Sequence, residues 1–220
     1  RFVSSDSRKI RLIMELRRAG VTDTRVLGAI ERLPRQMFVP EAFRDKVYEN
    51  TALPIGCAQT LTAPVAVGLM TQALEIGERM RVLEIGTGSG YTAAVLARLC
   101  RRVYTVERYR ELLVEAEERF KRLGFSNITT RTGDGTLGWP EQAPFERIIV
   151  TAAAHDVPPV LAEQLAVGGV MVVPVDHGPG DQRLLRVRRL AEGLETADLG
   201  EMRFVPLIAQ APSRRLPGGN

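Results

Sequence analysis

The chain has few of the residues that build disulfide frameworks, metal sites and aromatic clusters. Its 220 residues include only two cysteines and two histidines, and aromatic side chains make up 5%. Cys57 and Cys100 are too few for a disulfide framework or a four-ligand zinc site, and His155 and His177 lack the spacing of a helical metal-binding pair. We therefore expect no metal, and we expect free thiols of the kind found in cytoplasmic proteins.

Long hydrophobic runs are also missing. No apolar stretch approaches the roughly 20 residues that cross a bilayer, and the first residues show no apolar core of a signal peptide. Apolar residues still make up 45% of the chain and charged residues 25%, which is ordinary for a folded globular protein. We expect a folded protein without a membrane partner.

The positive charge is concentrated at the two ends of the chain. The net charge is +4 overall, but residues 1–40 carry +5, residues 213–220 carry +2, and residues 41–212 carry −3. A nucleic-acid-binding protein normally has its basic residues gathered on the folded domain. The mildly acidic body therefore predicts no nucleic-acid partner.

The first 80 residues show helical periodicity interrupted by one irregular loop. Apolar residues recur at helical spacing over residues 8–20, 22–33 and 65–74. Residues 50–64, rich in glycine, proline and threonine, have neither helical nor strand periodicity. In the first helix the expected apolar face comprises Ile10, Ile13, Met14 and Leu16.

From residue 81 the pattern changes to alternating strands and helices. Strands are predicted at residues 81–86, 102–107, 127–133, 146–152 and 168–175. Helices are predicted between them at residues 93–99, 109–123 and 159–165. This alternation is typical of an α/β fold with a doubly wound, mostly parallel sheet.

The chain end and the domain limits complete the predicted organisation. Two last strands, 183–190 and 199–208, are expected to form an antiparallel pair at the C-terminal side of the sheet. We expect residues 1–80 to be a helical extension that packs on a core of residues 81–210 and does not fold alone. The tail 211–220 is expected to be disordered.

A glycine-rich segment between the first strand and its helix is the clearest functional signal. Gly86, Gly88 and Gly90 let the chain turn tightly and let a ligand approach the backbone. The spacing differs from the dinucleotide fingerprint, whose third glycine would be at Tyr91. Glu84 precedes the glycines by two residues.

Two more acidic residues stand at the ends of the next two strands. Glu107 ends the second strand, where a carboxylate can accept both hydroxyls of a ribose, and Asp134 ends the third, where it can accept from an exocyclic amine. The alternative for each is a cap on the following helix. Together with the glycines they predict a nucleoside-bearing ligand at the carboxyl edge of the sheet.

Glu84 and the three glycines, taken with Glu107 and several other segments of the chain, resemble the motifs of the protein-L-isoaspartate O-methyltransferases. This family belongs to the class I S-adenosylmethionine-dependent enzymes. The similarity runs from about Val26 to Leu207. It rests on ALPIGCAQTLTAP (52–64), VLEIGTGSGYTAAVLA (82–97), GDGTLGWPEQAPFERIIVTAAA (133–154), GGVMVVPV (168–175) and RFVPL (203–207). The resemblance implies a Rossmann-like methyltransferase sheet and a monomeric enzyme that repairs isoaspartyl residues in damaged proteins.

The resemblance also implies roles for individual residues. The cofactor S-adenosylmethionine, and its product S-adenosylhomocysteine, would contact Glu84, Gly86, Thr87, Gly88, Gly90, Glu107, Asp134, Gly135 and Thr60. The family's Gln-Thr-[Ile/Leu]-Ser motif contains the residue usually assigned as catalytic, and here it is Gln59-Thr60-Leu61-Thr62. Thr62 and Thr60 are therefore the candidate catalytic residues.

This chemistry needs no strong base, because a carboxylate acceptor is already ionised at neutral pH. Two departures from the family pattern fall in the same loop: Ala58 replaces the usual glycine and Thr62 the usual serine. Ala58 requires either an ordinary or a strained φ. An alternative role for Thr62 is the N-cap of the helix that follows.

Two other functions are compatible with these motifs. One is a class I methyltransferase acting on RNA or a small molecule, although residues 151–156 (TAAAHD) lack the Asn-Pro-Pro-[Tyr/Phe] motif common in amine methylation. The other is a binding module that retains the cofactor pocket without turnover.

Overall fold

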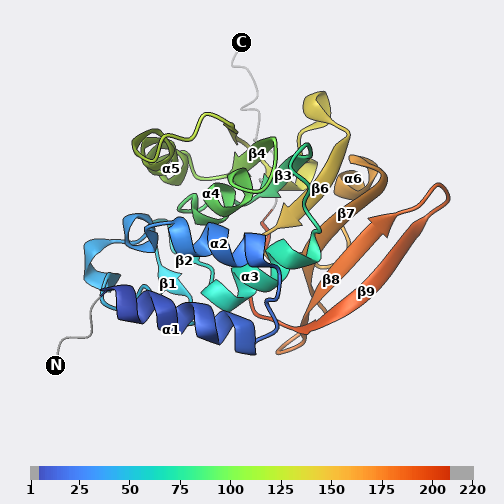
Figure 1. Cartoon of the computed structure of the whole chain (residues 1–220). Coiled ribbons are helices and arrows are strands. Elements are labelled where there is room, and N and C mark those ends of the chain that lie inside the picture. The colour runs from blue at the N-terminus through green and yellow to red at the C-terminus, as the bar shows by residue number, and fades with distance from the viewer. Residues whose placement is uncertain (1–4, 209–220) are drawn as a thin grey trace, which may run out of the picture.

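A computed structural model describes residues 5–208 as one mixed sheet flanked by helices (Figure 1). The tail 211–220 lies outside the described residues. Seven strands lie in the order β5-β4-β3-β6-β7-β8-β9. Their bounds are β3 (Arg81–Ile85), β4 (Arg102–Glu107), β5 (Ile128–Thr132), β6 (Phe145–Val150), β7 (Leu165–Asp176), β8 (Gln182–Arg189) and β9 (Leu194–Glu201). The predicted α/β fold with a mostly parallel sheet is confirmed.

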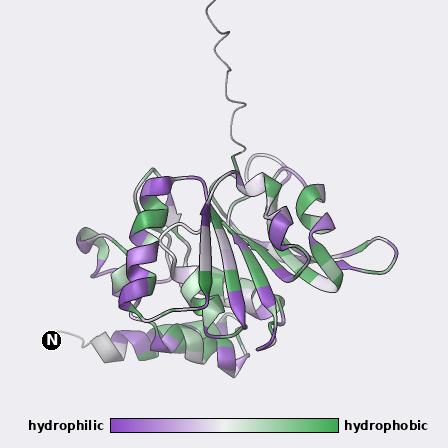
Figure 2. Cartoon of the chain, turned by 90° about the horizontal axis from the view of Figure 1, so that it is seen from above, coloured by the Kyte–Doolittle hydropathy of each residue, from purple (hydrophilic) through white to green (hydrophobic). Residues whose placement is uncertain are grey.

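The helices and short turns connect these strands. The α-helices are α1 (Ser5–Arg18), α2 (Thr24–Arg32), α3 (Pro64–Ala73), α4 (Tyr91–Ala97), α5 (Arg110–Arg122) and α6 (Pro159–Glu163). The 3₁₀ turns are η1 (Arg35–Phe38), η2 (Glu41–Phe43), η3 (Gly135–Leu137) and η4 (Pro140–Gln142). Figure 2 shows both hydrophobic and hydrophilic residues on the flanking helices, as expected for amphipathic helices. None of the helices within residues 5–208 is long and apolar enough to cross a bilayer.

The central strands are buried on both faces and alternate their side chains between two clusters. Val82 and Ile149 join the cluster that contains α1–α4, whereas Leu83 and Ile148 join the cluster beneath α6. This period of two is what a strand covered on both sides requires. The parallel strands β3, β4, β6 and β7 thereby form the buried centre of the sheet.

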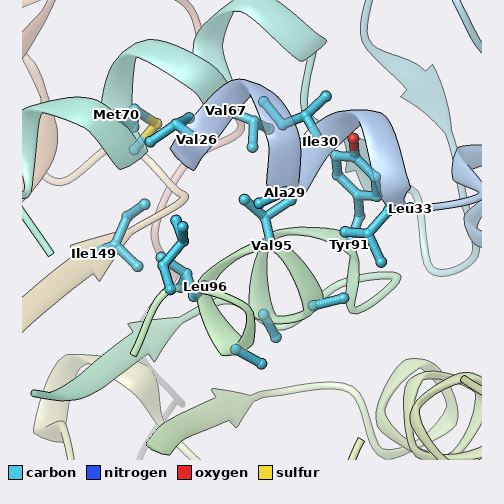
Figure 3. Packing of buried hydrophobic residues seen from close by; sticks show 14 of the residues in the cluster. Val26, Ala29, Ile30, Leu33, Val67, Met70, Tyr91, Val95, Leu96 and Ile149 are labelled. Carbon is cyan, nitrogen blue, oxygen red and sulfur yellow. The ribbon is translucent and has the colours of Figure 1, made fainter. Parts of the chain in front are cut away.

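The N-terminal helices pack directly on α4. Figure 3 shows Val26, Ala29 and Ile30 of α2 and Val67 and Met70 of α3 facing Val95 and Leu96 of α4. This contact is one continuous apolar core. It holds the segments that follow α2 and precede α3 against the sheet.

In α1 the buried face differs from the predicted one. Leu12 and Leu16 are buried, whereas Ile10 and Met14 expose 58% and 50% of their surface. Ile10, Ile13 and Met14 share helical spacing with one another, but Leu16 is two residues from Met14 and so lies on the other side of the helix, four residues from Leu12. Because α1 packs against α3, the side of α1 that carries Leu12 and Leu16 is the side that becomes buried.

The predicted strand 199–208 is wrong in its bounds. The last strand is β9 at Leu194–Glu201, antiparallel to β8, so the antiparallel pair exists but ends earlier. Residues 202–208 instead cross to the end of β6, where the Ala153 N–H donates to the Val205 carbonyl (2.8 Å) and Leu207 donates to the Ala153 carbonyl (2.7 Å). Toward β8, among residues 5–208, the segment bonds only the first residue, Gln182, whose carbonyl accepts from the Met202 N–H (3.1 Å) and whose side chain accepts from the Phe204 N–H (2.8 Å). The last helix also ends earlier than predicted, because Leu165 already pairs with Phe145 at the start of β7.

Candidate active site

A pocket opens at the carboxyl ends of the parallel strands β3, β4 and β6. The chain leaves β3 toward β4 on one side and leaves β6 toward β7 on the other, and this reversal between neighbouring strands is where open α/β sheets bind ligands. The lining includes Gln59–Thr62, Ile85–Ser89, Tyr91, Thr92, Val106–Tyr109, Gly135, Thr151, Ala152 and Val205–Ile208. The pocket therefore brings together the predicted loop 59–62, the glycine segment and Glu107.

The glycine segment adopts backbone angles that suit only glycine. Gly86, Gly88 and Gly90 have φ of 95°, 52° and 89°. A Cβ at Gly86 would lie 2.5 Å from the Thr151 hydroxyl, and one at Gly90 would lie 2.7 Å from the Phe120 ring of α5. Gly86 and Gly88 line the pocket, but Gly90 does not. Gly90 makes room for α5 to pack against the start of α4.

The carboxylate of Glu107 is held by main-chain donors at the end of β4. The Gly88 N–H donates to Oε2 at 2.8 Å and the Tyr109 N–H donates to Oε1 at 2.9 Å. Glu107 is 5% exposed and lines the pocket. Each carboxylate oxygen retains a second lone pair, so the group can accept two hydroxyls from a ligand without moving.

Glu84 lies beneath the glycine segment and outside the pocket lining. Its Oε2 accepts from the Thr105 hydroxyl at 2.6 Å, and the Thr105 and Thr87 hydroxyls are also 2.6 Å apart. Burial raises the pKa of Glu84 to about 8, against the opposing effect of the Thr105 hydrogen bond. Of this buried chain, only Thr87 lines the pocket.

Asp134 and Gly135 follow β5. One Asp134 carboxylate oxygen accepts from the Thr136 N–H (2.9 Å) and the Thr136 hydroxyl (2.6 Å), so Asp134 caps η3. The cap that was the alternative reading is therefore present. Gly135 lines the pocket, and its adenine contact, like that of Asp134, stays a prediction.

The opposite wall of the pocket is a small hairpin of β1 (Leu53–Pro54) and β2 (Thr60–Leu61). Its turn closes through the Gln59 N–H, which donates to the Gly56 carbonyl at 3.1 Å. Cys57 and Ala58 have φ of 56° and 55°, the left-handed region that non-glycine residues avoid. Ala58 is thus strained at the position where the family has glycine.

Thr60 and Thr62 both line the pocket. The N-cap of α3 is Ala63, and the helix N–H of Val65 is satisfied by the Asn50 side chain at 3.1 Å. The alternative role of Thr62 as that N-cap is therefore wrong. Within residues 5–208 the Thr62 hydroxyl makes no hydrogen bond, so it is available to a ligand.

Several lining residues were missed by the sequence analysis. Thr151 follows β6 and donates through its hydroxyl to the carbonyls of Ile85 (3.0 Å) and Gly86 (2.9 Å), and its place at a central strand end was a usable signal. The segment Val205–Ile208 gave no such signal, because it was predicted as strand. Arg108 donates to the Ile208 carbonyl at 2.9 Å and ties this segment to β4.

The pocket is built for positioning more than for acid–base chemistry. Its lining contains Glu107 and Arg108 as the charged residues and neither histidine nor cysteine. The part of the chain that the structure describes also holds no group of three or more residues arranged to bind a metal. Hydroxyl groups and main-chain amides dominate the polar surface.

Comparisons with known proteins agree with this geometry. The family profile described as "Protein-L-isoaspartate(D-aspartate) O-methyltransferase (PCMT)" matches residues 7–211. The protein named protein-L-isoaspartate O-methyltransferase in Paramagnetospirillum magneticum is 62% identical, covering 94% of this chain and 98% of its own length. The protein of the same name in Rhodospirillum rubrum is also 62% identical, covering 98% and 100%.

Solved structures give the same result for the fold. A protein-L-isoaspartate O-methyltransferase structure, 30% identical, superposes with a TM-score of 0.82 over 90% of this chain and 65% of that one. A Plasmodium falciparum structure described under the same enzyme name, in complex with S-adenosyl-L-homocysteine, superposes with a TM-score of 0.78 at 23% identity. With the profile matching nearly the whole chain and two full-length relatives at 62% identity, this chain belongs to the protein-L-isoaspartate(D-aspartate) O-methyltransferase family.

Proposed function

We propose that the chain transfers a methyl group from S-adenosylmethionine to the free α-carboxylate of L-isoaspartyl residues in damaged proteins. Family membership supports the reaction class, and the relatives' name states the substrate class. Glu107 would hold the ribose, Gly86, Thr87 and Gly88 would lie along the methionine part, and Gly135 and Asp134 would face the adenine. Glu84 and Gly90 would act indirectly, by supporting the glycine segment.

The observation that carries the proposal is the pairing of two walls in one pocket. A fixed ribose acceptor, Glu107, lies on one wall, and the hydroxyls of Thr60 and Thr62 lie on the other. Hydroxyl donors can orient an anionic carboxylate without placing a cation beside a sulfonium. The absence of a histidine or cysteine from the lining agrees with an acceptor that needs no deprotonation.

Methyl transfer then depends on alignment. The bound cofactor supplies the methyl group on a positively charged sulfur. An oxygen of the acceptor carboxylate bonds to the methyl carbon as the carbon–sulfur bond breaks, so no side chain has to remove a proton. Thr60 and Thr62 would hold that oxygen in line, at roughly 3 Å from the methyl carbon, and the Val205–Ile208 segment would exclude water.

A methyl-transfer assay with three acceptors tests the proposal. The purified chain is given radiolabelled S-adenosylmethionine with an isoaspartyl peptide, its aspartyl twin, or bulk RNA. We expect label on the isoaspartyl peptide alone. Equal labelling of both peptides, labelling of RNA, or cofactor binding without any transfer would contradict it, and the last two results would favour the alternatives.

The remaining expectations on assembly and location are part of the same proposal. We infer a monomer that acts in the cytoplasm on exposed isoaspartyl segments, with no nucleic-acid or membrane partner. Cys57 and Cys100 are free thiols, which supports a reducing compartment. We also propose that residues 1–80 do not fold alone, because α2 and α3 share one apolar core with α4. Light scattering and the behaviour of an isolated 1–80 fragment test these points.

A further inference from the structure

Arg35 is a buried cation next to the active-site loop. It begins η1 and is 1% exposed, and within residues 5–208 it has no carboxylate partner. Its Nε donates to the Val47 carbonyl at 3.0 Å and its Nη2 donates to the Thr62 carbonyl at 2.8 Å. Its Cζ lies 4.4 Å from the centroid of the Tyr91 ring. Figure 3 shows Tyr91 at the start of α4, directed toward the N-terminal helices.

A charge in this position is unfavourable for stability alone. Burial lowers the pKa of the Arg35 guanidinium, against the opposing effect of Tyr91. An unpaired buried ion costs several kcal/mol, and apolar residues of similar volume often replace buried ions without loss. The two carbonyls and the aromatic face offset part of that cost. What Arg35 does provide is a fixed position for the two main-chain carbonyls that it binds, those of Val47 and Thr62.

Of these two residues, Thr62 is the one that belongs to the pocket lining. Arg35 joins η1 to Thr62, which lines the pocket, and its guanidinium covers the ring of Tyr91, which lines the same pocket. Thr62 lies between β2 and α3, and its carbonyl accepts the Arg35 hydrogen bond at 2.8 Å. A planar guanidinium that bonds two carbonyls at once fixes direction as well as distance.

Arg119 of α5 makes the corresponding connection on the other wall. It donates through Nε to the Met37 carbonyl of η1 at 2.9 Å and through Nη1 to the Ser89 carbonyl at 3.1 Å. It also pairs with Glu115 at 2.8 Å. One 3₁₀ turn is therefore tied by Arg35 to the Thr62 segment and by Arg119 to the glycine segment.

We propose that Arg35 is a positioning residue for methyl transfer, which sets the Thr62 main chain so that the hydroxyls of Thr60 and Thr62 face the acceptor carboxylate. The inference rests on the proposed function. It assigns Arg35 to the acceptor side of the pocket, in contrast to Arg119, which serves the cofactor side.

Two matched variants, Arg35→Met and Arg119→Met, test this assignment. For Arg35→Met we expect kcat/KM for the isoaspartyl peptide to fall about 10- to 100-fold per folded molecule, mainly through kcat. The reason is that a shift of about 1 Å in the groups that orient the acceptor carboxylate can cost about 100-fold in rate. Its Kd for S-adenosylhomocysteine should stay within about threefold of the wild-type value. Arg119→Met should raise that Kd by more than about threefold.

Arg35→Lys keeps the test decisive if Arg35→Met does not fold. A lysine retains the charge but cannot hold both carbonyls in a fixed fork, so kcat/KM should still fall at least about fivefold. Hydrogen exchange should speed up in residues 60–63 and not in residues 86–90.

A role in stability alone would appear as a lower Tm with unchanged kcat/KM per folded molecule, and it would overturn the proposal. So would equal losses in peptide turnover and S-adenosylhomocysteine affinity. A wild-type chain that does not methylate the isoaspartyl peptide would refute the proposed function instead, and the two failures are therefore distinguishable.

Discussion

The two walls of the pocket differ in how their backbone is held. On the proposed cofactor wall, Gly86 and Gly88 take up positive φ without strain, and Glu107 is fixed by two amides. On the acceptor wall, the left-handed positions are occupied by Cys57 and Ala58 in a hairpin of two-residue strands. The proposed nucleoside site is thus formed by strand ends of the sheet itself, whereas the proposed acceptor site depends on contacts from outside the sheet, such as that between Arg35 and Thr62.

Gly90→Ala should have the largest effect. The added Cβ would meet the Phe120 ring at 2.7 Å and force a φ of 89° on a non-glycine residue. Left-handed strain and overpacking together predict a loss of about 2–5 kcal/mol in the free energy of unfolding. Denaturant unfolding measures it. Gly124→Ala is the control, because its φ of 74° is similar but the space is open; an equal loss there would remove packing from the explanation.

Glu84→Gln should change how stability depends on pH. The folded pKa of about 8 exceeds the ordinary glutamate pKa of 4.5, so the folded state binds the extra proton between these pH values. The stability this proton provides is complete below about pH 4.5 and is lost as the pH rises toward 8, by at most about 1.4 kcal/mol per pH unit, or about 5 kcal/mol over the whole interval. Tm series for both proteins should converge at low pH and separate above pH 5. Parallel series would contradict a protonated Glu84.

Glu107→Ala should weaken S-adenosylmethionine and S-adenosylhomocysteine binding by roughly 1.5–3 kcal/mol, the scale for hydrogen bonds to a charged acceptor. Adenosine binding should fall in parallel, because the ribose is shared. Calorimetry on the folded variant measures both. Glu111→Ala, in the first turn of α5 and outside the pocket lining, is the matched control. Unchanged affinity in Glu107→Ala would move the ribose site elsewhere.

Thr62→Ala should lower kcat/KM by about 1–3 kcal/mol, or 5- to 150-fold, through loss of one charge-assisted hydrogen bond. Thr62→Ser should stay within about tenfold of wild type, since the hydroxyl remains. Because Thr62 is not the cap of α3, the Tm of both variants should be nearly unchanged. A destabilised Thr62→Ala with wild-type turnover would remove Thr62 from the catalytic residues.

Ala58→Gly should have the smallest effect and the opposite sign. Relief of the left-handed strain should raise the free energy of unfolding by about 1–2 kcal/mol. The greater conformational freedom of glycine in the unfolded chain should lower it by about 0.4–1 kcal/mol. A net gain of about 0.5–1 kcal/mol is expected in urea unfolding. Ala73→Gly, in the last turn of α3, should instead lose stability. A loss in both would mean that Ala58 is not strained.

Much of the cofactor wall follows from short sequence patterns. A strand, a glycine-rich turn and a helix in succession place Gly86 and Gly88 at the carboxyl edge of a parallel sheet, and the next strand brings Glu107 beside them. These positions depend on local periodicity and on the handedness of the crossover, both of which are visible in a single chain. The family resemblance added Thr60 and Thr62 to the same pocket.

Other assignments depended on which way a side chain faces. Glu84 and Gly90 belong to the same motif as Gly86, yet one is buried beneath the glycine segment and the other faces α5. Asp134 ends a strand as Glu107 does, but it caps η3. Spacing along the chain does not distinguish these cases, because the twist of each strand end and the element packed on it decide the direction.

The alternating strands and helices, the glycine-rich turn after β3, and the charge and thiol content can be predicted from the chain alone, because each depends on composition or on neighbouring residues. The tertiary structure alone decided that residues 202–208 leave the sheet to line the pocket, that Asn50 rather than Thr62 satisfies the start of α3, and that Arg35 lies buried against Thr62. The contacts of Ala153 with residues 205 and 207 and of Arg35 with Thr62 join residues that are far apart in the chain, and at the start of α3 the distant Asn50 takes the place of the adjacent Thr62 as hydrogen-bond acceptor. Their energies depend on burial and geometry that exist only after the helices have packed on the sheet.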